Sequence, residues 1–174
     1  MTLNFTETLP DALRSIRHTG EYYEFIVHEK EMPLQDPMLN MMITQYGNSK
    51  WNVVDLLNAQ YSTVLPEKFD LYNWLHYNDN DEVAYFLNEV GSNTLTHSEF
   101  KAPHAFRIWL GTNGFIIGVQ QNGKGFNAKE VDEKQIKSNE GAAFTFFRNC
   151  RSTIFFDNVQ ETRIVFMEYR FYNV

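Results

Sequence analysis

An acidic residue and an amide residue lie one helical turn apart near the middle of the chain. They are Glu89 and Asn93, within the segment LNEVGSNTLTH at 87–97. Because residues four apart share one face of a helix, both side chains lie on one stripe. The carboxylate can act as a general base, and the amide oxygen can ligate Mg²⁺, which prefers oxygen ligands. For these two residues alone, a solvated polar helix face is the more common explanation.

Two glycine-containing segments follow, QNGKGF at 121–126 and NEGAAF at 139–144. Gly123 and Gly125 allow left-handed dihedrals and close backbone approach, so backbone amides can face a phosphate. Gly141 is expected to open a helix, whose exposed N–H groups and dipole favour an anion. The alternatives are an ordinary turn after a strand and a plain helix start.

Hydrophobic periodicity predicts the elements that position these segments. The expected helices cover 9–18, two stretches between 37 and 61 separated at 47–49, 82–97, and 140–149, with a loop and short helix in 64–78. The expected strands cover 21–29, 105–112, 115–121, 152–158 and 162–171. Asp79 to Asp81 should cap the 82–97 helix, and Asn113-Gly114 should turn a β-hairpin. The prediction is an α+β two-layer sandwich, a mainly antiparallel sheet with helices on one face.

Composition narrows the class of protein. The 174 residues carry a net charge of −7, which argues against a nucleic-acid partner because such partners require clustered Lys and Arg. One cysteine, Cys150, precludes an intramolecular disulfide and is consistent with a cytoplasmic location. No apolar run approaches the roughly 18 residues of a membrane span, and the N-terminal residues do not read as a signal peptide. We expect residues 1–174 to form a single domain, with 1–80 as N-terminal elements and 82–171 as its core.

In their order along the chain, these segments resemble the boxes of the GHKL (histidine-kinase-type, Bergerat) ATPases. LNEVGSNTLTHS resembles the N box, in which a Glu precedes a Mg²⁺-binding Asn by four residues. NGKGF is similar to the end of the first glycine box, normally Asp-x-Gly-x-Gly, and NEGAAFTFF stands where the second box belongs. The resemblance covers about residues 82–171 and is closest to stand-alone anti-sigma-factor serine kinases.

The resemblance implies a site for ATP or ADP with Mg²⁺. It assigns Glu89 as catalytic base, Asn93 as Mg²⁺ ligand, Gln121 as the adenine contact, and Gly123, Gly125, Phe126 and Gly141 to the bound nucleotide.

Three departures from the family pattern affect this site. Gln121 replaces the adenine-reading Asp. A hydrogen bond to a carboxylate is worth about 1.5–3 kcal/mol against about 0.5–1.5 kcal/mol for a neutral one, and losing that difference weakens binding about tenfold. Ala142 and Ala143 replace the second box's glycine, and the lid between Gly125 and Gly141 is short, with alternating charges typical of an exposed helix.

Two functions are compatible with these features. The first is a stand-alone regulatory protein that binds adenine nucleotide, a serine kinase or anti-sigma-type regulator that can form a homodimer by analogy. The second is a nucleotide-free pseudo-ATPase that binds a partner protein. Whether the chain is an enzyme is left open by these residues.

Overall fold

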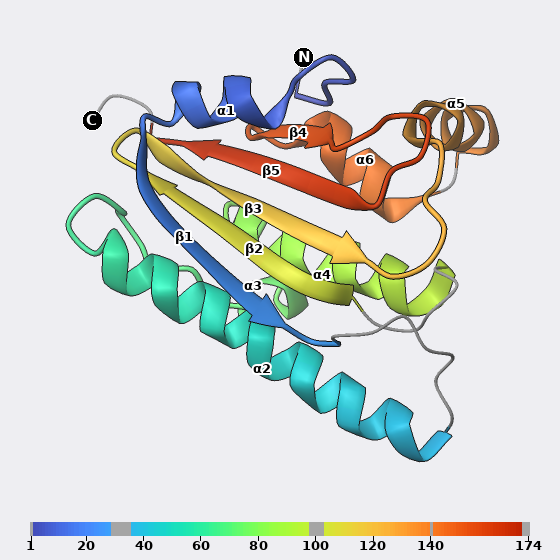
Figure 1. The fold of residues 1–174 in the computed structure, drawn as a ribbon, viewed down its shortest axis with the longest axis horizontal. Helices are drawn as coiled ribbons and strands as arrows, with labels where there is room; N and C mark the ends of the chain where they lie inside the picture. Colours follow the sequence, from blue (N-terminus) through green and yellow to red (C-terminus); the bar gives the residue numbers. More distant parts are fainter. Residues whose placement is uncertain (1, 29–35, 98–102, 140, 172–174) are drawn as a thin grey trace.

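The computed structural model describes residues 2–28, 36–97, 103–139 and 141–171 (Figure 1). The helices are α1 Leu9–Ser15, α2 Asp36–Gln60, α3 Tyr72–Leu75, α4 Glu82–His97, α5 Ala128–Ser138 and α6 Ala142–Asn149. The strands are β1 His18–Ile26, β2 Pro103–Gly111, β3 Gly114–Gln121, β4 Thr153–Phe156 and β5 Ile164–Arg170.

The five strands form one antiparallel sheet in the order β1-β2-β3-β5-β4. The predicted hairpin is confirmed, since β2 and β3 pair with Leu110 opposite Phe115. β5 lies between β3 and β4, with Phe166 opposite both Gly118 and Phe155. The predicted α+β sandwich is therefore confirmed.

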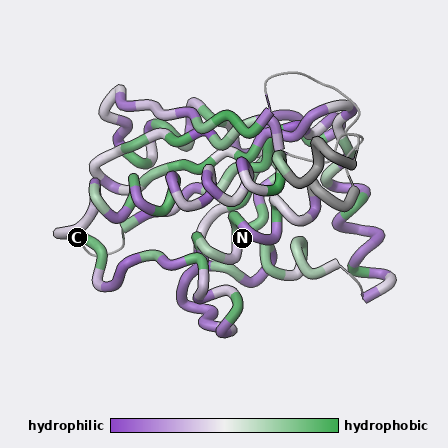
Figure 2. Tube along the Cα trace, turned by 90° about the horizontal axis from the view of Figure 1, so that it is seen from below, coloured by the Kyte–Doolittle hydropathy of each residue, from purple (hydrophilic) through white to green (hydrophobic). Residues whose placement is uncertain are grey.

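The main core lies between the sheet and α2, α4 and α6. Because side chains alternate along a strand, every second residue of β2, β3 and β5 faces this helical layer. Fully buried members include Leu57, Phe86, Leu87, Phe106, Ile108, Ile117 and Met167. The longest hydrophobic stretches follow the strands, whereas the helices alternate hydrophobic and hydrophilic residues (Figure 2).

One short helix covers part of the opposite face of the sheet. Ala12 of α1 and Ile16, directly after this helix, pack over Ile116, Phe155 and Phe166 and form a second, smaller apolar cluster. Thr8 caps this helix by accepting a hydrogen bond from the Asp11 N–H. The sandwich therefore carries most of its helices on one face and α1 on the other.

The predicted break at 47–49 is wrong, because α2 is one continuous helix of 25 residues. Tyr46, Ser49, Val53 and Leu57 are all buried, so one stripe of the helix faces the protein interior without interruption. Glycine inside a helix lowers its stability by about 1 kcal/mol relative to alanine. The stabilisation gained by burying the Tyr46 and Val53 side chains is larger than this loss.

The predicted cap of α4 is confirmed. Asp81 Oδ1 accepts a hydrogen bond from the Ala84 N–H at 3.0 Å. Its other oxygen accepts from the Asp70 N–H at 2.8 Å and from Asn73 Nδ2 at 2.9 Å. One carboxylate thus starts α4 and also ties it to α3 and the segment before it.

Tyr61, just beyond α2, fixes the β2–β3 turn. Its hydroxyl lies 2.9 Å from the Gly111 carbonyl oxygen, and the Gly111 N–H donates to the hydroxyl at 3.1 Å. Burial raises the pKa of Tyr61 to about 12.

We expect Tyr61→Phe to lower the free energy of unfolding by about 1–3 kcal/mol, because it leaves the Gly111 N–H unpaired. Urea unfolding measures the loss; Tyr77→Phe, at a hydroxyl-bearing side chain that is 86% exposed, is the control, and equal effects would contradict the prediction.

Candidate functional site

The segments singled out in the sequence lie toward one end of the molecule. The end of β3, the second half of α4 and the start of α6 all lie on the right of Figure 1. α4 contacts both β3 and α6. Two aromatic pairs join the helices. The ring centres of Phe86 and Phe147 are 6.4 Å apart, and those of Tyr85 and Phe146 are 5.8 Å apart. The fold therefore brings the Glu89 helix next to the helix that Gly141 opens.

Glu89 is half-buried, and its carboxylate is in contact with α3. Trp74 Nε1 donates a hydrogen bond to Glu89 Oε1 at 3.4 Å. Burial and, secondarily, the charge of Glu89 raise the pKa of Tyr46 on α2. Asn93 is half-buried one turn further along α4. The predicted stripe exists, and the described contacts of Glu89 are with neighbouring helices.

The glycine loop after β3 is held by its own chain. Gln121 Nε2 donates a hydrogen bond to the Lys124 carbonyl oxygen at 3.0 Å. The side-chain amide predicted to contact adenine therefore binds the backbone of its own loop. Gly123 has a φ of +83°, the left-handed conformation predicted for this position. Phe126 pairs with Thr162 through two backbone hydrogen bonds of 3.1 and 2.7 Å. This loop is thereby fixed beside the start of β5.

Gly125 is required by close packing. A Cβ at this position would lie 2.6 Å from the carbonyl carbon of Glu161. The neighbour is backbone, which cannot move aside as a flexible side chain can. Glycine is therefore needed at position 125 because the backbone of Glu161, just before β5, leaves no room for a side chain.

Gly141 is the N-cap residue of α6 and has a φ of +95°. A Cβ here would lie 2.0 Å from Gln135 Oε1, so the Gln135 amide packs directly against Gly141. This amide oxygen is buried and has no hydrogen-bond partner. The space beside the start of α6 is occupied by a side chain of α5. Glu140, in the same box, lies outside the described residues.

α5 is the predicted charged helix, and it is anchored to α6. Arg148 of α6 forms an ion pair with Asp132, which is 8% exposed. Asn127 caps the helix by accepting from the Glu130 N–H at 3.0 Å. The lid-like segment is therefore docked against α6, with Asp132 and Gln135 both turned inward.

The contact between α2 and α4 contains residues that the sequence did not single out. Lys50 Nζ donates to Asn88 Oδ1 at 2.7 Å and lies 4.3 Å from the centre of the Tyr46 ring. Burial lowers the pKa of the Lys50 ammonium to about 8. Lys50 and Asn88 are 38 residues apart, so no local spacing could have indicated this pair.

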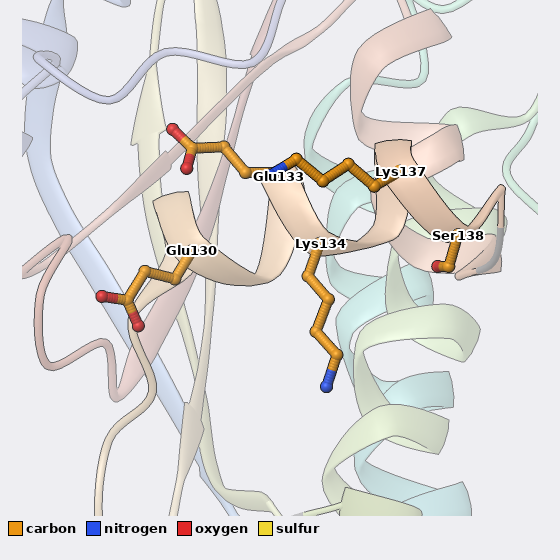
Figure 3. Close-up of a pocket in the computed structure, with 5 residues that line it drawn as sticks. All are labelled: Glu130, Glu133, Lys134, Lys137 and Ser138. Carbon is orange, nitrogen blue, oxygen red and sulfur yellow. The ribbon is translucent and has the colours of Figure 1, made fainter.

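A shallow cavity lies on the outer surface of α5. It is lined by Glu130, Glu133, Lys134, Lys137 and Ser138, all from this one helix. The side chains do not converge on a common point (Figure 3). A second cavity lies near the start of α4. The residues assigned to the nucleotide line neither cavity.

The part of the chain that the structure describes contains neither a group of metal-ligand side chains nor a membrane-spanning helix. There, no three His, Cys, Asp or Glu residues are grouped as metal ligands. No helix in those ranges is both long and apolar enough to cross a bilayer.

Comparison with known proteins gives no match among protein-family models, curated proteins or solved structures.

Proposed function

We propose that this chain is a regulatory protein that acts by binding a partner protein. It would have a GHKL-like fold in which the Gln135 side chain fills the space beside Gly141, where the nucleotide phosphates would bind. It would act in the cytoplasm. The observation that carries the proposal is the Gln135 amide packed against Gly141.

Two structural features argue against phosphate binding at the start of α6. A phosphate bound at the start of α6 would need the space that the Gln135 side chain fills, because exposed N–H groups at a helix start are what attract an anion. Gln135 belongs to α5, and the Asp132–Arg148 ion pair holds this helix against α6. Asp132 is 8% exposed, so separating its carboxylate from the partly exposed Arg148 would leave a buried charge without its partner.

An exposed apolar cluster around α3 supports a protein partner. Tyr72, Leu75 and Tyr77 are 56%, 55% and 86% exposed, and Tyr72 packs against Trp51 with ring centres 5.4 Å apart. Exposed apolar groups gathered in one place are typical of protein-binding surfaces.

Nucleotide binding is the second candidate, and the order of the elements favours it. The Glu89 helix, the β2–β3 hairpin, the glycine loop, α5, α6 and two closing strands follow in the order that the GHKL resemblance implies. Gly123 also has the left-handed conformation that a phosphate-binding loop uses. In this case Asn93 would bind Mg²⁺ and Glu89 would act as base, as in a serine kinase.

Calorimetric titration with ATP and ADP, with and without Mg²⁺, separates the two candidates. We expect no saturable heat at millimolar nucleotide for the folded protein, because the Gln135 side chain fills the space at the start of α6 where the phosphates would bind. Asn93→Ala should behave as the wild type does.

Asn52→Ala, an exposed amide on α2, is the matched control. Mg²⁺-dependent binding that Asn93→Ala abolishes and Asn52→Ala preserves would overturn the proposal and establish the nucleotide site.

A further inference from the structure

The two edge strands of the sheet, β4 and β1, differ in what covers them (Figure 1). Leu3 forms a parallel bridge with Ile154 of β4. The Asn4 N–H donates to the Ile154 carbonyl oxygen at 2.8 Å, and the Ile154 N–H donates to the Thr2 carbonyl oxygen at 2.7 Å. Within the described ranges, β1 pairs with β2 alone. The N-terminal residues thus cover the β4 edge, whereas the outer edge of β1 is open.

The backbone of β1 directs hydrogen-bonding groups toward this open edge. The Val27 N–H, directly after β1, donates to the His104 carbonyl oxygen of β2 at 3.0 Å. In an antiparallel pair, the residues that bond to a given neighbour alternate along the strand. Tyr22, Glu24 and Ile26 therefore point their N–H and carbonyl groups away from β2. Such a row of backbone groups is a template for pairing with another strand.

The side chains of this segment do not prevent such pairing. From Tyr22 to Ile26 the strand pairs regularly with β2 and contains no Lys or Pro, residues that commonly block edge strands. Tyr22, Tyr23 and Ile26 are all exposed. Glu24 forms an ion pair with Arg107, whose Nη1 lies 3.2 Å from Glu24 Oε1. This part of the edge is therefore apolar, and its one carboxylate is neutralised within the chain.

The sequence of β1 is compatible with pairing to a second copy of itself. In an antiparallel pair about a two-fold axis, the residue on the axis lies opposite itself. An axis at Glu24 would oppose two carboxylates, which is destabilising. An axis at Tyr23 instead sets the two Tyr23 rings side by side and Tyr22 opposite Glu24 of the second copy. Glu21 then lies opposite Phe25, so no like charges are directly opposed.

This register also brings opposite charges together. Arg107 Nη1 donates to the Tyr22 hydroxyl at 2.6 Å. Glu24 of the second copy would lie opposite this Tyr22, so its carboxylate would approach the Arg107 guanidinium. The two-fold axis repeats the contact, because each copy supplies both groups. Since the β4 edge is already covered, association through β1 ends at two copies.

We propose that this protein forms a homodimer in which β1 pairs antiparallel with β1 of a second copy, about an axis at Tyr23. The two sheets would join into one continuous sheet, with the main helical layers of both copies on the same side. The proposal is independent of the proposed function, because neither α3 nor the glycine loop takes part in it.

Sedimentation equilibrium of the folded protein tests the dimer. We expect the wild type to be dimeric at micromolar concentration. Tyr23→Lys and Tyr23→Glu should each raise the dissociation constant about tenfold or more, because each places like charges opposite one another at the axis. An equimolar mixture of the two variants should recover the dimer, since lysine then faces glutamate. Tyr77→Lys, at an exposed position outside β1, is the matched control and should remain dimeric.

Cross-linking tests the register. Residues in a non-hydrogen-bonded antiparallel pair have Cα atoms about 4.5 Å apart, within the range that a disulfide spans. Tyr23→Cys should therefore form a disulfide-linked dimer on mild oxidation, whereas Tyr77→Cys should not; the native Cys150 is buried. A wild type that stays monomeric would overturn the proposal, as would a dimer that Tyr23→Lys leaves intact or that Tyr23→Cys does not cross-link.

Discussion

Gly91→Ala is expected to lower the free energy of unfolding by about 3 kcal/mol. The added Cβ would lie 1.6 Å from Tyr46 Oη and 2.2 Å from Tyr46 Cζ. The Tyr46 ring cannot move freely, because it is 4% exposed, stacks 5.9 Å from Phe106 and donates to the Leu87 carbonyl oxygen at 3.0 Å. Thermal and urea unfolding measure the loss.

Gly47→Ala is the matched control for this prediction. Gly47 also lies inside a helix, and a Cβ there would meet nothing within 4 Å. Alanine is a better helix former than glycine, so Gly47→Ala should stabilise the protein by about 0.5–1 kcal/mol. Opposite signs for the two substitutions are expected; a stabilising Gly91→Ala would show that Tyr46 does not pack as described.

The Gly91 prediction also bears on how the predicted N box is interpreted. Gly91 lies between Glu89 and Asn93, inside the segment that resembles a nucleotide-binding motif. Contact with Tyr46 accounts for the glycine by packing alone. At least one residue of the motif therefore has a structural explanation that needs no nucleotide.

Glu82→Ala is expected to cost about 3 kcal/mol or more. Glu82 is 6% exposed, and its carboxylate accepts from the Arg151 N–H, from the Ser152 N–H at 3.1 Å and from the Ser152 hydroxyl at 2.6 Å. Removing it leaves these donors without their acceptor, and each unsatisfied buried donor costs about 1–3 kcal/mol. The expected result is a large fall in the urea midpoint.

Glu133→Ala, at an exposed position of α5, controls for the loss of a negative charge. Its effect should remain within about 0.5 kcal/mol, as is usual for surface substitutions. A Glu82→Ala protein as stable as Glu133→Ala would contradict the view that Glu82 anchors the turn between α6 and β4.

Local sequence determined most of the secondary structure. The α4 helix with its Asp81 cap and the β2–β3 hairpin at Asn113-Gly114 depend on residues within a few positions of each other. Periodicity, capping and turn chemistry act over this range, so they can be recognised from the sequence. The α2 helix is the exception: its local signal at Gly47 indicated a break, and burial against the core kept the helix continuous.

The tertiary structure decided what surrounds each candidate residue. The sequence placed Gly91, Gly125 and Gly141 in nucleotide-binding boxes, whereas packing set Tyr46, Glu161 and Gln135 against them. The cavity at the start of α4 likewise joins Lys68 and Arg151, which are far apart along the chain. Such contacts depend on how helices and strands dock against one another. The sequence therefore determined which elements form, and only the packed structure decided which side chains meet, because docking depends on shape and volume across the whole core.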